Sequence, residues 1–582
     1  MCGINGIISN NIDLYKSINQ MNNTTLHRGP DDTGVYINKR DKIALGMNRL
    51  AILGLKTGSQ PMYSKDKKKI LVFNGEIFNF NELCKKYLNK SYQSDTKTLL
   101  DLFCKYGPKC LDFLNGMFAF AFYDLNKKKV YIGRDRFGIK PLYYFSKNKF
   151  IFSSEVKALK KILNSSLNID FQNISNYITL NHSHGDNTIY KDIKKLPPGH
   201  YIEFSLKKNF FDIKKWYYPK YSPQVFKNKK ECIEIADHQI KKSLNLWTKS
   251  DVPISFLLSG GMDSGLLTKM YSEKKNEKIN TISLAFKTKG EEKWNEINTI
   301  NKLVKDINSN HKTIFFDSKI FLNDFNKIIS SLDEPYGGGL PSWFVFKQIS
   351  KNFKVAISGT GGDEIFGNYN RYFKLKAIKK KIGITRFNEY FYNLYFSNNR
   401  WKKKYTNLKI YPETSDTFYK NIHKTNFKNS SKKFSMLDFN TQLKDEFLYI
   451  TDLFSMKHSL EVRTPYLDHE LVELIYNMPE RYRISKSIYK PILRSIGKKI
   501  LPKEYIDQSK KGFSLPLSHY MRGMLKPYIE EYFSKKNIEQ LGVMKFDFVE
   551  HYVKPMLKGE NKHIQLIWNI LILQIWAKKN IL

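Results

Sequence analysis

The chain has few cysteines, and none of them is spaced for a disulfide framework or a zinc site. Its 582 residues include five cysteines, at positions 2, 84, 104, 110 and 232, and no two of them form a C-x-x-C motif. An odd number of scattered cysteines is typical of a reducing compartment. The sequence therefore disfavours a secreted, disulfide-stabilised protein and predicts a cytoplasmic location.

Long hydrophobic runs are also missing. The first residues, MCGINGIISNN, contain no basic segment followed by an apolar run, which a secretory signal peptide needs. The longest apolar stretch, residues 564–577, is shorter than the roughly 20 residues that span a bilayer, and Gln565, Asn569 and Gln574 interrupt it. We therefore expect a buried helix there and no membrane partner.

Acidic residues are scarce beside basic ones, since 55 Asp and Glu stand against 97 Lys and Arg, for a net charge of +42. Such an excess is one property of nucleic-acid-binding proteins. Here it is spread along the chain without a recognition helix, an RNA-binding signature or a zinc module, as compositional drift produces. We expect no nucleic-acid partner, although the charge can help to attract anionic substrates.

The pattern of apolar residues divides the chain into two domains, as its length also suggests. Residues 2–205 hold short β-type runs separated by turn residues. Residues 206–230 are rich in Lys, Asn and Pro and predict a linker. From residue 231 to residue 582 strands first alternate with helices, and the part after about 370 looks mostly helical. This alternation predicts a parallel sheet with helices on both faces.

Cys2 is the candidate nucleophile of the first domain. Removal of Met1 leaves Cys2 with a thiol and a free α-amine on one residue. Because an α-amine titrates at about pH 8, it can accept the thiol proton without help from a histidine. Thiols are often inert unless they are activated, so Cys2 taken alone leaves a chance cysteine as the alternative.

Short motifs at characteristic spacing accompany Cys2. They are HRGPD from His27, RLAI from Arg49, NGEI from Asn74 and the pair Ser94–Asp95. Together with MCGI they resemble the glutaminase domain of class II glutamine amidotransferases, the N-terminal-nucleophile type. The resemblance implies an α+β domain folded as an αββα sandwich, with L-glutamine as its substrate.

The resemblance also assigns roles to these residues. Cys2 is the nucleophile, and the Asn74 side chain and the Gly75 N–H form the oxyanion hole. Arg49 suits the carboxylate of glutamine as a planar fork of donors, and Glu76 and Asp95 suit its ammonium. Ordinary surface ion pairing is the alternative for these charged residues. The expected glutamine-binding set is Arg49, Leu50, Ala51, Ile52, Leu53, Asn74, Gly75, Glu76 and Asp95.

The second domain carries an S-G-G-x-D-S loop, residues 259–264, between a predicted strand and a predicted helix. Its glycines let backbone N–H groups face a phosphate chain, and the helix N-terminus adds a favourable dipole. The loop lacks the lysine of a P-loop. It resembles the pyrophosphate loop of enzymes that split ATP into AMP and pyrophosphate, with a plain Gly/Ser-rich turn as the alternative.

A second signature, SGTGGDEIFG from Ser358, follows another predicted strand. Asp263 and Asp363 lie beyond the carboxyl ends of their strands, where α/β sites form, and two carboxylates with phosphate oxygens suit Mg²⁺. By resemblance both hold Mg²⁺, and Lys490 neutralises charge on the departing phosphates. The expected ATP-binding set is Leu257, Ser259, Gly260, Gly261, Asp263, Ser264, Leu284, Ser358 and Gly359.

Both halves in this order resemble the glutamine-hydrolysing asparagine synthetase family. The resemblance implies a doubly wound, ATP pyrophosphatase-type second domain, ATP and Mg²⁺ as cofactors, and a homodimer. It implies that Cys2 releases ammonia from glutamine and that a tunnel carries the ammonia to an acyl-adenylate of L-aspartate. Asparagine, glutamate, AMP and pyrophosphate are the expected products.

Thr360 departs from the family pattern. Asparagine synthetases usually carry an acidic residue at this position, and here it is a neutral hydroxyl. Thr360 is therefore our candidate for the acceptor pocket, and a different carboxylate, such as a sugar acid of surface-polysaccharide biosynthesis, stays open beside aspartate. A non-enzymatic binding protein is the third interpretation, which the retained set of candidate catalytic residues disfavours.

Overall fold

The computed structural model describes residues 2–163, 167–220, 226–275, 277–286, 295–316, 318–367, 391, 397–409, 414–423, 430–485, 488–507 and 516–581. Residues 221–225 of the predicted linker lie outside these ranges, as do residues 368–390 of the predicted helical part.

Two antiparallel six-stranded sheets form the first domain. One has the order β10-β8-β9-β1-β3-β2 and the other β12-β11-β7-β6-β5-β4. The first sheet comprises β1 (Cys2–Ile8), β2 (Asp32–Asn38), β3 (Ile43–Arg49), β8 (Tyr143–Phe145), β9 (Phe150–Ser153) and β10 (Ile193–Lys195). The second comprises β4 (Met62–Tyr63), β5 (Lys69–Ile77), β6 (Gly116–Asp124), β7 (Lys129–Arg134), β11 (His200–Ser205) and β12 (Phe210–Lys215).

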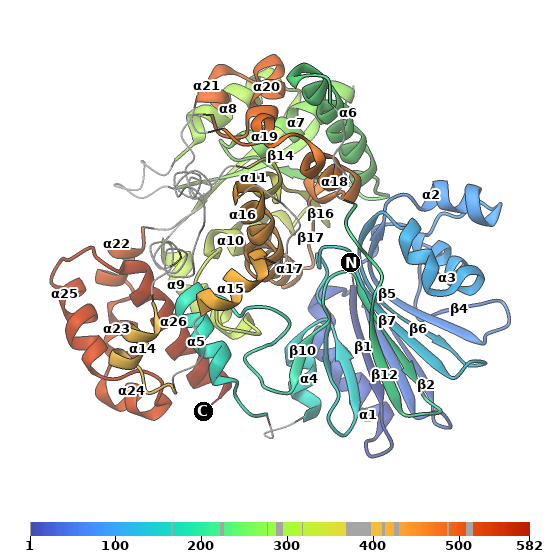
Figure 1. The fold of residues 1–582 in the computed structure, drawn as a ribbon, viewed down its shortest axis with the longest axis horizontal. Helices are drawn as coiled ribbons and strands as arrows, with labels where there is room; N and C mark the ends of the chain where they lie inside the picture. Colours follow the sequence, from blue (N-terminus) through green and yellow to red (C-terminus); the bar gives the residue numbers. More distant parts are fainter. Residues whose placement is uncertain are drawn as a thin grey trace.

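Alternation along the strands explains why helices cover both outer faces. In β5, Ile70 and Val72 face the core between the sheets, whereas Leu71 and Phe73 pack in a separate cluster that contains Leu99 of α3. Helices α1 (Leu14–Thr25) and α4 (Val156–Leu163) cover the first sheet, and α3 (Asp95–Tyr106) covers the second. This arrangement is the predicted αββα sandwich (Figure 1). Two more helices are α2 (Phe80–Leu83) and α5 (Phe171–Leu180).

A five-stranded parallel sheet, in the order β15-β14-β13-β16-β17, forms the centre of the second domain. Its strands are β13 (Ile254–Leu257), β14 (Ile279–Phe286), β15 (Ser309–Phe316), β16 (Val355–Ile357) and β17 (Glu461–Arg463). The predicted alternation of strands and helices from residue 231 agrees with the first four, whereas β17 falls in the part expected to be mostly helical. The chain order reverses between β13 and β16, so a crevice for ligands is expected beyond their carboxyl ends.

Helices cover both faces of this sheet, as the alternation predicts. Ala356 packs in the cluster that contains α10 (Leu340–Ile349) and α17 (Tyr449–Met456). Ile357, the next residue, packs in the cluster that contains α7 (Met262–Lys274) and α20 (Pro491–Ile500). Further helices are α6 (Lys229–Trp247), α8 (Ile297–Asp306), α9 (Ser318–Ser331), α11 (Gly362–Phe366), α18 (His469–Asn477), α19 (Glu480–Arg483) and α21 (Lys503–Asp507).

The remaining part is helical, as predicted. It comprises α14 (Asn399–Tyr405), α15 (Thr414–His423), α16 (Ser430–Asp438), α22 (Leu517–Arg522), α23 (Lys526–Tyr532), α24 (Lys535–Leu541), α25 (Lys554–Leu557) and α26 (Ile564–Asn580). Residues 566–577 of α26 are all buried, so the longest apolar stretch forms the predicted buried helix. Among the described helices, none combines the length and the apolar character needed to cross a membrane.

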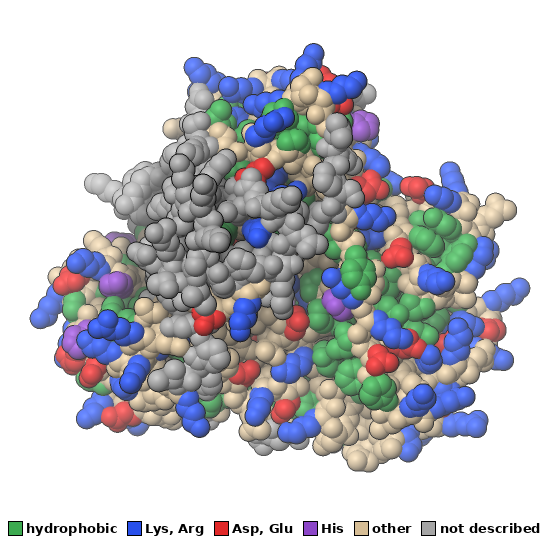
Figure 2. Space-filling model, in the orientation of Figure 1, with side chains coloured by type: hydrophobic (Ala, Val, Ile, Leu, Met, Phe, Trp, Pro, Cys, Tyr) green, Lys and Arg blue, Asp and Glu red, His purple; other side chains and the backbone are tan. Residues whose placement is uncertain are grey.

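The first domain continues past residue 205. Strand β12 pairs with β11 through residues 210–215, within the segment predicted as a linker, and α6 begins at Lys229. Basic side chains are scattered over the face seen in Figure 2 and are interspersed with acidic ones.

Candidate active sites

Cys2 begins β1 and lies opposite Arg49 of β3. It is 4% exposed, and its backbone nitrogen donates a hydrogen bond to Asn74 Oδ1 at 2.9 Å. Burial raises the pKa of the Cys2 thiol. A neutral, buried thiol needs a base beside it to become a nucleophile, and the α-amine that Met1 removal creates would be held at the Asn74 side chain.

Strand β5 places Asn74 and Gly75 beside Cys2. Asn74 is fully buried, and its Nδ2 has no hydrogen-bond partner among the described residues, so it is available as a donor. Gly75 has a φ of +145°, and a Cβ there would lie 2.1 Å from the carbonyl oxygen of Met117. Only glycine fits this backbone. The pair can therefore present two donors to a developing oxyanion.

Arg49 directs its guanidinium at the loop that follows it. Nη2 donates to the carbonyl oxygens of Leu53, at 3.2 Å, and Gly54, at 2.8 Å, and Nη1 donates to that of Leu55 at 3.2 Å. The sequence predicts that this fork binds the carboxylate of glutamine. In the described geometry it holds the predicted glutamine-binding loop in shape.

That loop lies at the boundary between the domains. Leu50 and Ile52 pack against Val355 and Met456 of the second domain. Ile52 also accepts a backbone hydrogen bond from the N–H of Asp251. Within the first domain, the carboxylate of Asp31 accepts a bond from the Ala51 N–H at 2.8 Å. The expected glutamine site is therefore built against the second domain.

Glu76 and Asp95 are buried, at 3% and 4% exposure, so ordinary surface ion pairing does not describe them. Ser94 caps α3 through its side chain and thereby places Asp95 in the first turn, where Asp95 Oδ2 accepts from the Ile77 N–H at 3.0 Å. Burial raises the pKa of both carboxyls, and Asp95 raises that of Glu76 further. Two adjacent buried carboxyls suit a cationic group such as an ammonium.

The S-G-G-x-D-S loop lies between β13 and α7, as predicted. Ser259 Oγ and Ser264 Oγ are 2.8 Å apart, and Ser259 Oγ accepts from the Gly261 N–H at 3.2 Å. The Gly260 N–H donates to Glu296 Oε2 at 3.1 Å. The loop therefore folds back on itself at the start of α7, where the helix dipole favours phosphate.

Lys490 joins the carboxylates that the sequence analysis singled out. Its Nζ contacts Asp363 Oδ1 at 2.5 Å and also contacts Asp263 Oδ2. Burial alone would lower the pKa of Lys490, but the two carboxylates raise it above its usual value. The three side chains thus meet at one point beyond the carboxyl ends of β13 and β16.

Gly362 makes this convergence sterically feasible. A Cβ at Gly362 would lie 2.9 Å from Asp263 Cγ, so a larger residue would push the two signatures apart. The donor chemistry fits Mg²⁺, because Asp263 and Asp363 offer carboxylate oxygens to one point and phosphate oxygens can complete an octahedron. Among the described residues no group of three or more metal-ligating side chains forms, so protein ligands alone do not build a metal cage.

The rest of the predicted nucleotide site flanks this point. Leu257 and Leu284 are half-buried and pack against the same cluster, so an apolar surface remains at the ends of their strands. Ser358 and Gly359 follow β16, and Ser358 Oγ lies 2.8 Å from Thr360 Oγ1. Thr360, the residue predicted for the acceptor pocket, is therefore hydrogen-bonded to the neutral hydroxyl of Ser358.

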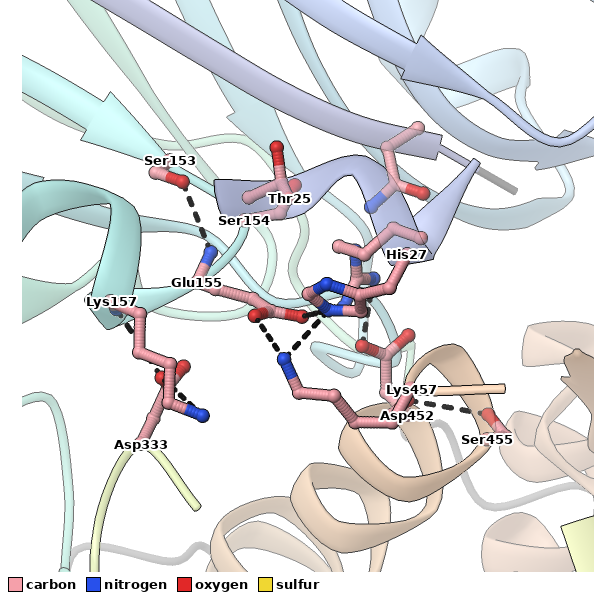
Figure 3. A network of polar contacts seen from close by, with 12 residues as sticks. Thr25, His27, Ser153, Ser154, Glu155, Lys157, Asp333, Asp452, Ser455 and Lys457 are labelled. Atoms are coloured by element: carbon pink, nitrogen blue, oxygen red, sulfur yellow. Dashed lines mark hydrogen bonds and ion pairs between the residues drawn. The ribbon is translucent and has the colours of Figure 1, made fainter. Parts of the chain in front are cut away.

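Sequence reasoning missed a buried ionic network between the domains. His27 and Glu155 of the first domain face Asp452 and Lys457 of the second (Figure 3). Arg28 joins them through Glu155 and Asp452. His27 and Arg28 belong to the HRGPD motif, whereas no local pattern marked the other members, because the contacts span hundreds of residues.

Comparisons with known proteins give two family matches along the chain. Residues 1–218 match the family described as glutamine amidotransferase domain. Residues 236–578, more than half of the chain, match the family described as asparagine synthase.

Among curated relatives, asparagine synthetase (glutamine-hydrolyzing) 1 of Bacillus subtilis is 27% identical over the whole of this chain and 97% of its own length. A putative asparagine synthetase (glutamine-hydrolyzing) 2 of Methanocaldococcus jannaschii is 36% identical over 63% of this chain and 76% of its own length. A solved regulatory enzyme of purine biosynthesis covers 54% of this chain and 80% of its own at 13% identity, with a TM-score of 0.29, too low to support a conclusion. The chain belongs to the asparagine synthase family of glutamine-dependent ligases.

Proposed function

We propose that the protein is a glutamine-hydrolysing asparagine synthase. It transfers the amide nitrogen of L-glutamine to the side-chain carboxylate of L-aspartate at the expense of ATP, and forms asparagine, glutamate, AMP and pyrophosphate. We assign glutamine hydrolysis to the domain that begins at Cys2 and ligation to the domain from residue 231 onward, and we expect a homodimer.

The observation that carries the proposal is the convergence of Asp263, Asp363 and Lys490 beside the S-G-G-x-D-S loop. A pyrophosphate group placed there would meet a cation, a helix N-terminus and two carboxylates able to share Mg²⁺.

In the first domain the Cys2 thiol attacks the amide carbon of glutamine and gives its proton to the α-amine. Asn74 Nδ2 and the Gly75 N–H stabilise the resulting oxyanion. Collapse of the tetrahedral intermediate breaks the C–N bond, and the α-amine returns the proton to the departing nitrogen. Ammonia is released, and the glutamyl group remains on Cys2 as a thioester. Water then hydrolyses the thioester to glutamate and restores the thiol.

Ammonia must then cross from one domain to the other. A cavity of about 20 Å³ lies at the boundary, lined by Arg134 and Tyr143 of the first domain and by Tyr449 and Asp452 of the second. That volume holds about one water-sized molecule, and ammonia is of similar size. We propose that ammonia crosses at this boundary.

In the second domain the acceptor carboxylate attacks the α-phosphorus of ATP and displaces pyrophosphate. Mg²⁺ held by Asp263 and Asp363 would supply charge neutralisation, and the Lys490 ammonium would stabilise the same leaving group. Adenylation is needed because a free carboxylate has no adequate leaving group. Ammonia then attacks the acyl carbon and displaces AMP.

The second candidate is the same reaction on another carboxylate. It is favoured by Thr360, a neutral residue paired with Ser358 where the family usually carries an acid. A sugar acid lacks the ammonium of aspartate, so a pocket with one acidic group fewer suits it.

A comparison of acceptors at fixed glutamine and ATP separates the two candidates. Pyrophosphate release is measured with L-aspartate, with several uronic acids and without acceptor. Release that depends on aspartate, with asparagine formed, supports the synthase. Release that depends only on a uronic acid supports the second candidate, and glutaminase activity without any acceptor-dependent release contradicts both.

A further inference from the structure

A single side chain, that of Arg28, connects Asp452 of the second domain to the backbone of Cys2. The guanidinium of Arg28 is fully buried, and each of its three nitrogens has its own acceptor. Nε donates to the carbonyl oxygen of Cys2 at 3.1 Å, Nη1 to Glu155 Oε1 at 3.2 Å, and Nη2 to Asp452 Oδ2 at 2.8 Å.

Asp452 lies on α17 of the second domain, and Glu155 precedes α4 of the first. A guanidinium is planar and rigid, so its three donors keep a fixed relation to one another. A shift of Asp452 is therefore transmitted to the Cys2 carbonyl, while Glu155 acts as the pivot. Burial strengthens this coupling, because water cannot replace a partner that moves away.

Surrounding charges hold the pivot in its ionised form. Burial alone would raise the pKa of Glu155, but His27, Lys457 and Arg28 hold it well below its usual value. Lys457 Nζ lies 2.9 Å from Glu155 Oε2 and 2.7 Å from His27 Nε2 (Figure 3). Burial alone would lower the pKa of Arg28, and Asp452 and Glu155 raise it instead.

Asp452 has a second buried partner in the first domain. Lys140 Nζ lies 3.4 Å from Asp452 Oδ1, and its side chain is 1% exposed. The carboxylate is therefore held by two cations of the first domain while it belongs to a helix of the second. The same carboxylate also lines the cavity between the domains.

We propose that Asp452 is a positioning residue for glutamine hydrolysis, which acts through Arg28 to hold the Cys2 backbone against Asn74. Glutaminase activity then depends on correct docking of α17, so the ligase half controls when ammonia is produced. This inference rests on the proposed two-site reaction.

The test uses the full chain and Asp452→Asn, which keeps the shape of the side chain and removes its charge. Glutaminase kcat is expected to fall roughly ten- to hundredfold, as a displaced catalytic group produces, while the KM for glutamine changes less than about threefold. Pyrophosphate release driven by ammonium chloride should stay near the wild-type level. A wild type that shows no ammonia-driven pyrophosphate release would contradict the proposed function itself, which distinguishes that outcome from a failure of the present proposal.

A double-mutant cycle checks the route of the effect. Arg28→Lys keeps the charge but loses the fork, and Asp452→Asn should cost little further glutaminase activity in that background. Tyr217→Phe is the matched control, because it removes another bond between the domains, to Glu473 Oε1 at 2.9 Å, without contacting Arg28. It should leave glutaminase kcat unchanged.

Three results would overturn the proposal: wild-type glutaminase in Asp452→Asn, an equal loss of glutaminase and ammonia-driven activity, or additive effects in the cycle. If Asp452→Asn does not fold, Asp452→Glu serves instead, since it keeps the charge and displaces it by one methylene. Its glutaminase kcat is expected to fall at least threefold, and an unchanged kcat overturns the proposal.

Discussion

Nη2 of Arg463, on the last strand of the parallel sheet, lies 3.8 Å from Oε1 of Glu76 in the first domain. Both side chains are buried. Arg463 directs its other donors elsewhere, with Nε 2.5 Å from Glu461 Oε1 and Nη1 bonded to the carbonyls of Trp247 and Lys249. Glu76 therefore receives little compensation for its burial, and its pKa is raised well above the usual value.

This raised pKa predicts that Glu76 lowers stability at neutral pH. A carboxyl whose pKa is higher in the folded state than in the unfolded state, where it is near 4.5, contributes its full stability at a pH below the unfolded-state pKa. That stability is lost as the pH rises through the folded-state pKa. We expect Glu76→Gln to raise the apparent Tm at pH 8 and to leave it nearly unchanged at pH 4. Thermal unfolding across this range checks it, and a lower Tm at pH 8 would contradict it.

Glu155 should behave in the opposite way. Its pKa is depressed, so its contribution is complete above the unfolded value of about 4.5 and is lost as the pH falls through the folded value. Glu155→Gln leaves the buried Arg28 and the partly exposed Lys457 with one carboxylate fewer, and breaking a buried ion pair typically costs about 3–5 kcal/mol. We expect a clearly lower Tm at pH 7 and a smaller difference at pH 3, measured in the same experiment. An equal loss at both pH values would argue against an ionic role.

The strands and motif positions of this fold were predictable because they depend on local patterns. Short apolar runs marked β5, β6 and β9, and the turn residues after β13 and β16 marked the two signatures that meet at Lys490. Strands β2 and β12 are harder to recognise from such runs, since β12 is largely exposed and β2 half-exposed, and neither has the composition of a core strand.

The contacts between the domains could not be predicted in this way. Arg28 meets Asp452 across 424 positions of the chain, and Arg463 meets Glu76 across a comparable span. Such pairs follow from how the two domains dock, which no window of sequence encodes. Within one domain, the bonds from Arg49 to the carbonyls of residues 53–55 likewise depend on how the loop folds, and its predicted contact with the glutamine carboxylate stays a prediction.

Cys2→Ala should separate the two reactions. Glutamine hydrolysis and glutamine-driven synthesis are expected to vanish, because Cys2 supplies the attacking thiol beside Asn74, while ammonia-driven pyrophosphate release stays within about twofold of wild type. Glutamate formation and pyrophosphate release are measured in parallel. Cys104→Ala, at an exposed cysteine, is the matched control and should leave both intact.

If Cys2→Ala also lost ammonia-driven release while it remained folded, the two sites would not be separate. Residual glutaminase above background would instead mean that another group attacks the amide.

Lys490→Met should affect only the ligase half. Removal of the ammonium between Asp263 and Asp363 is expected to lower acceptor-dependent pyrophosphate release about 100-fold or more, as loss of a group that stabilises developing charge does. Glutaminase activity should change less than twofold. Lys498→Met, at an exposed position of α20, the helix that Lys490 precedes, is the control. Comparable activity in the two variants would remove Lys490 from the proposed mechanism.

The most direct test of the whole account follows the nitrogen itself. The wild-type protein is incubated with glutamine labelled with ¹⁵N in its amide, ATP, Mg²⁺ and L-aspartate, and the label is located by mass spectrometry together with pyrophosphate release. The account predicts label in the side-chain amide of asparagine, with one pyrophosphate released for each asparagine formed. Glutamate and free labelled ammonia without labelled asparagine, whether or not pyrophosphate appears, would contradict it.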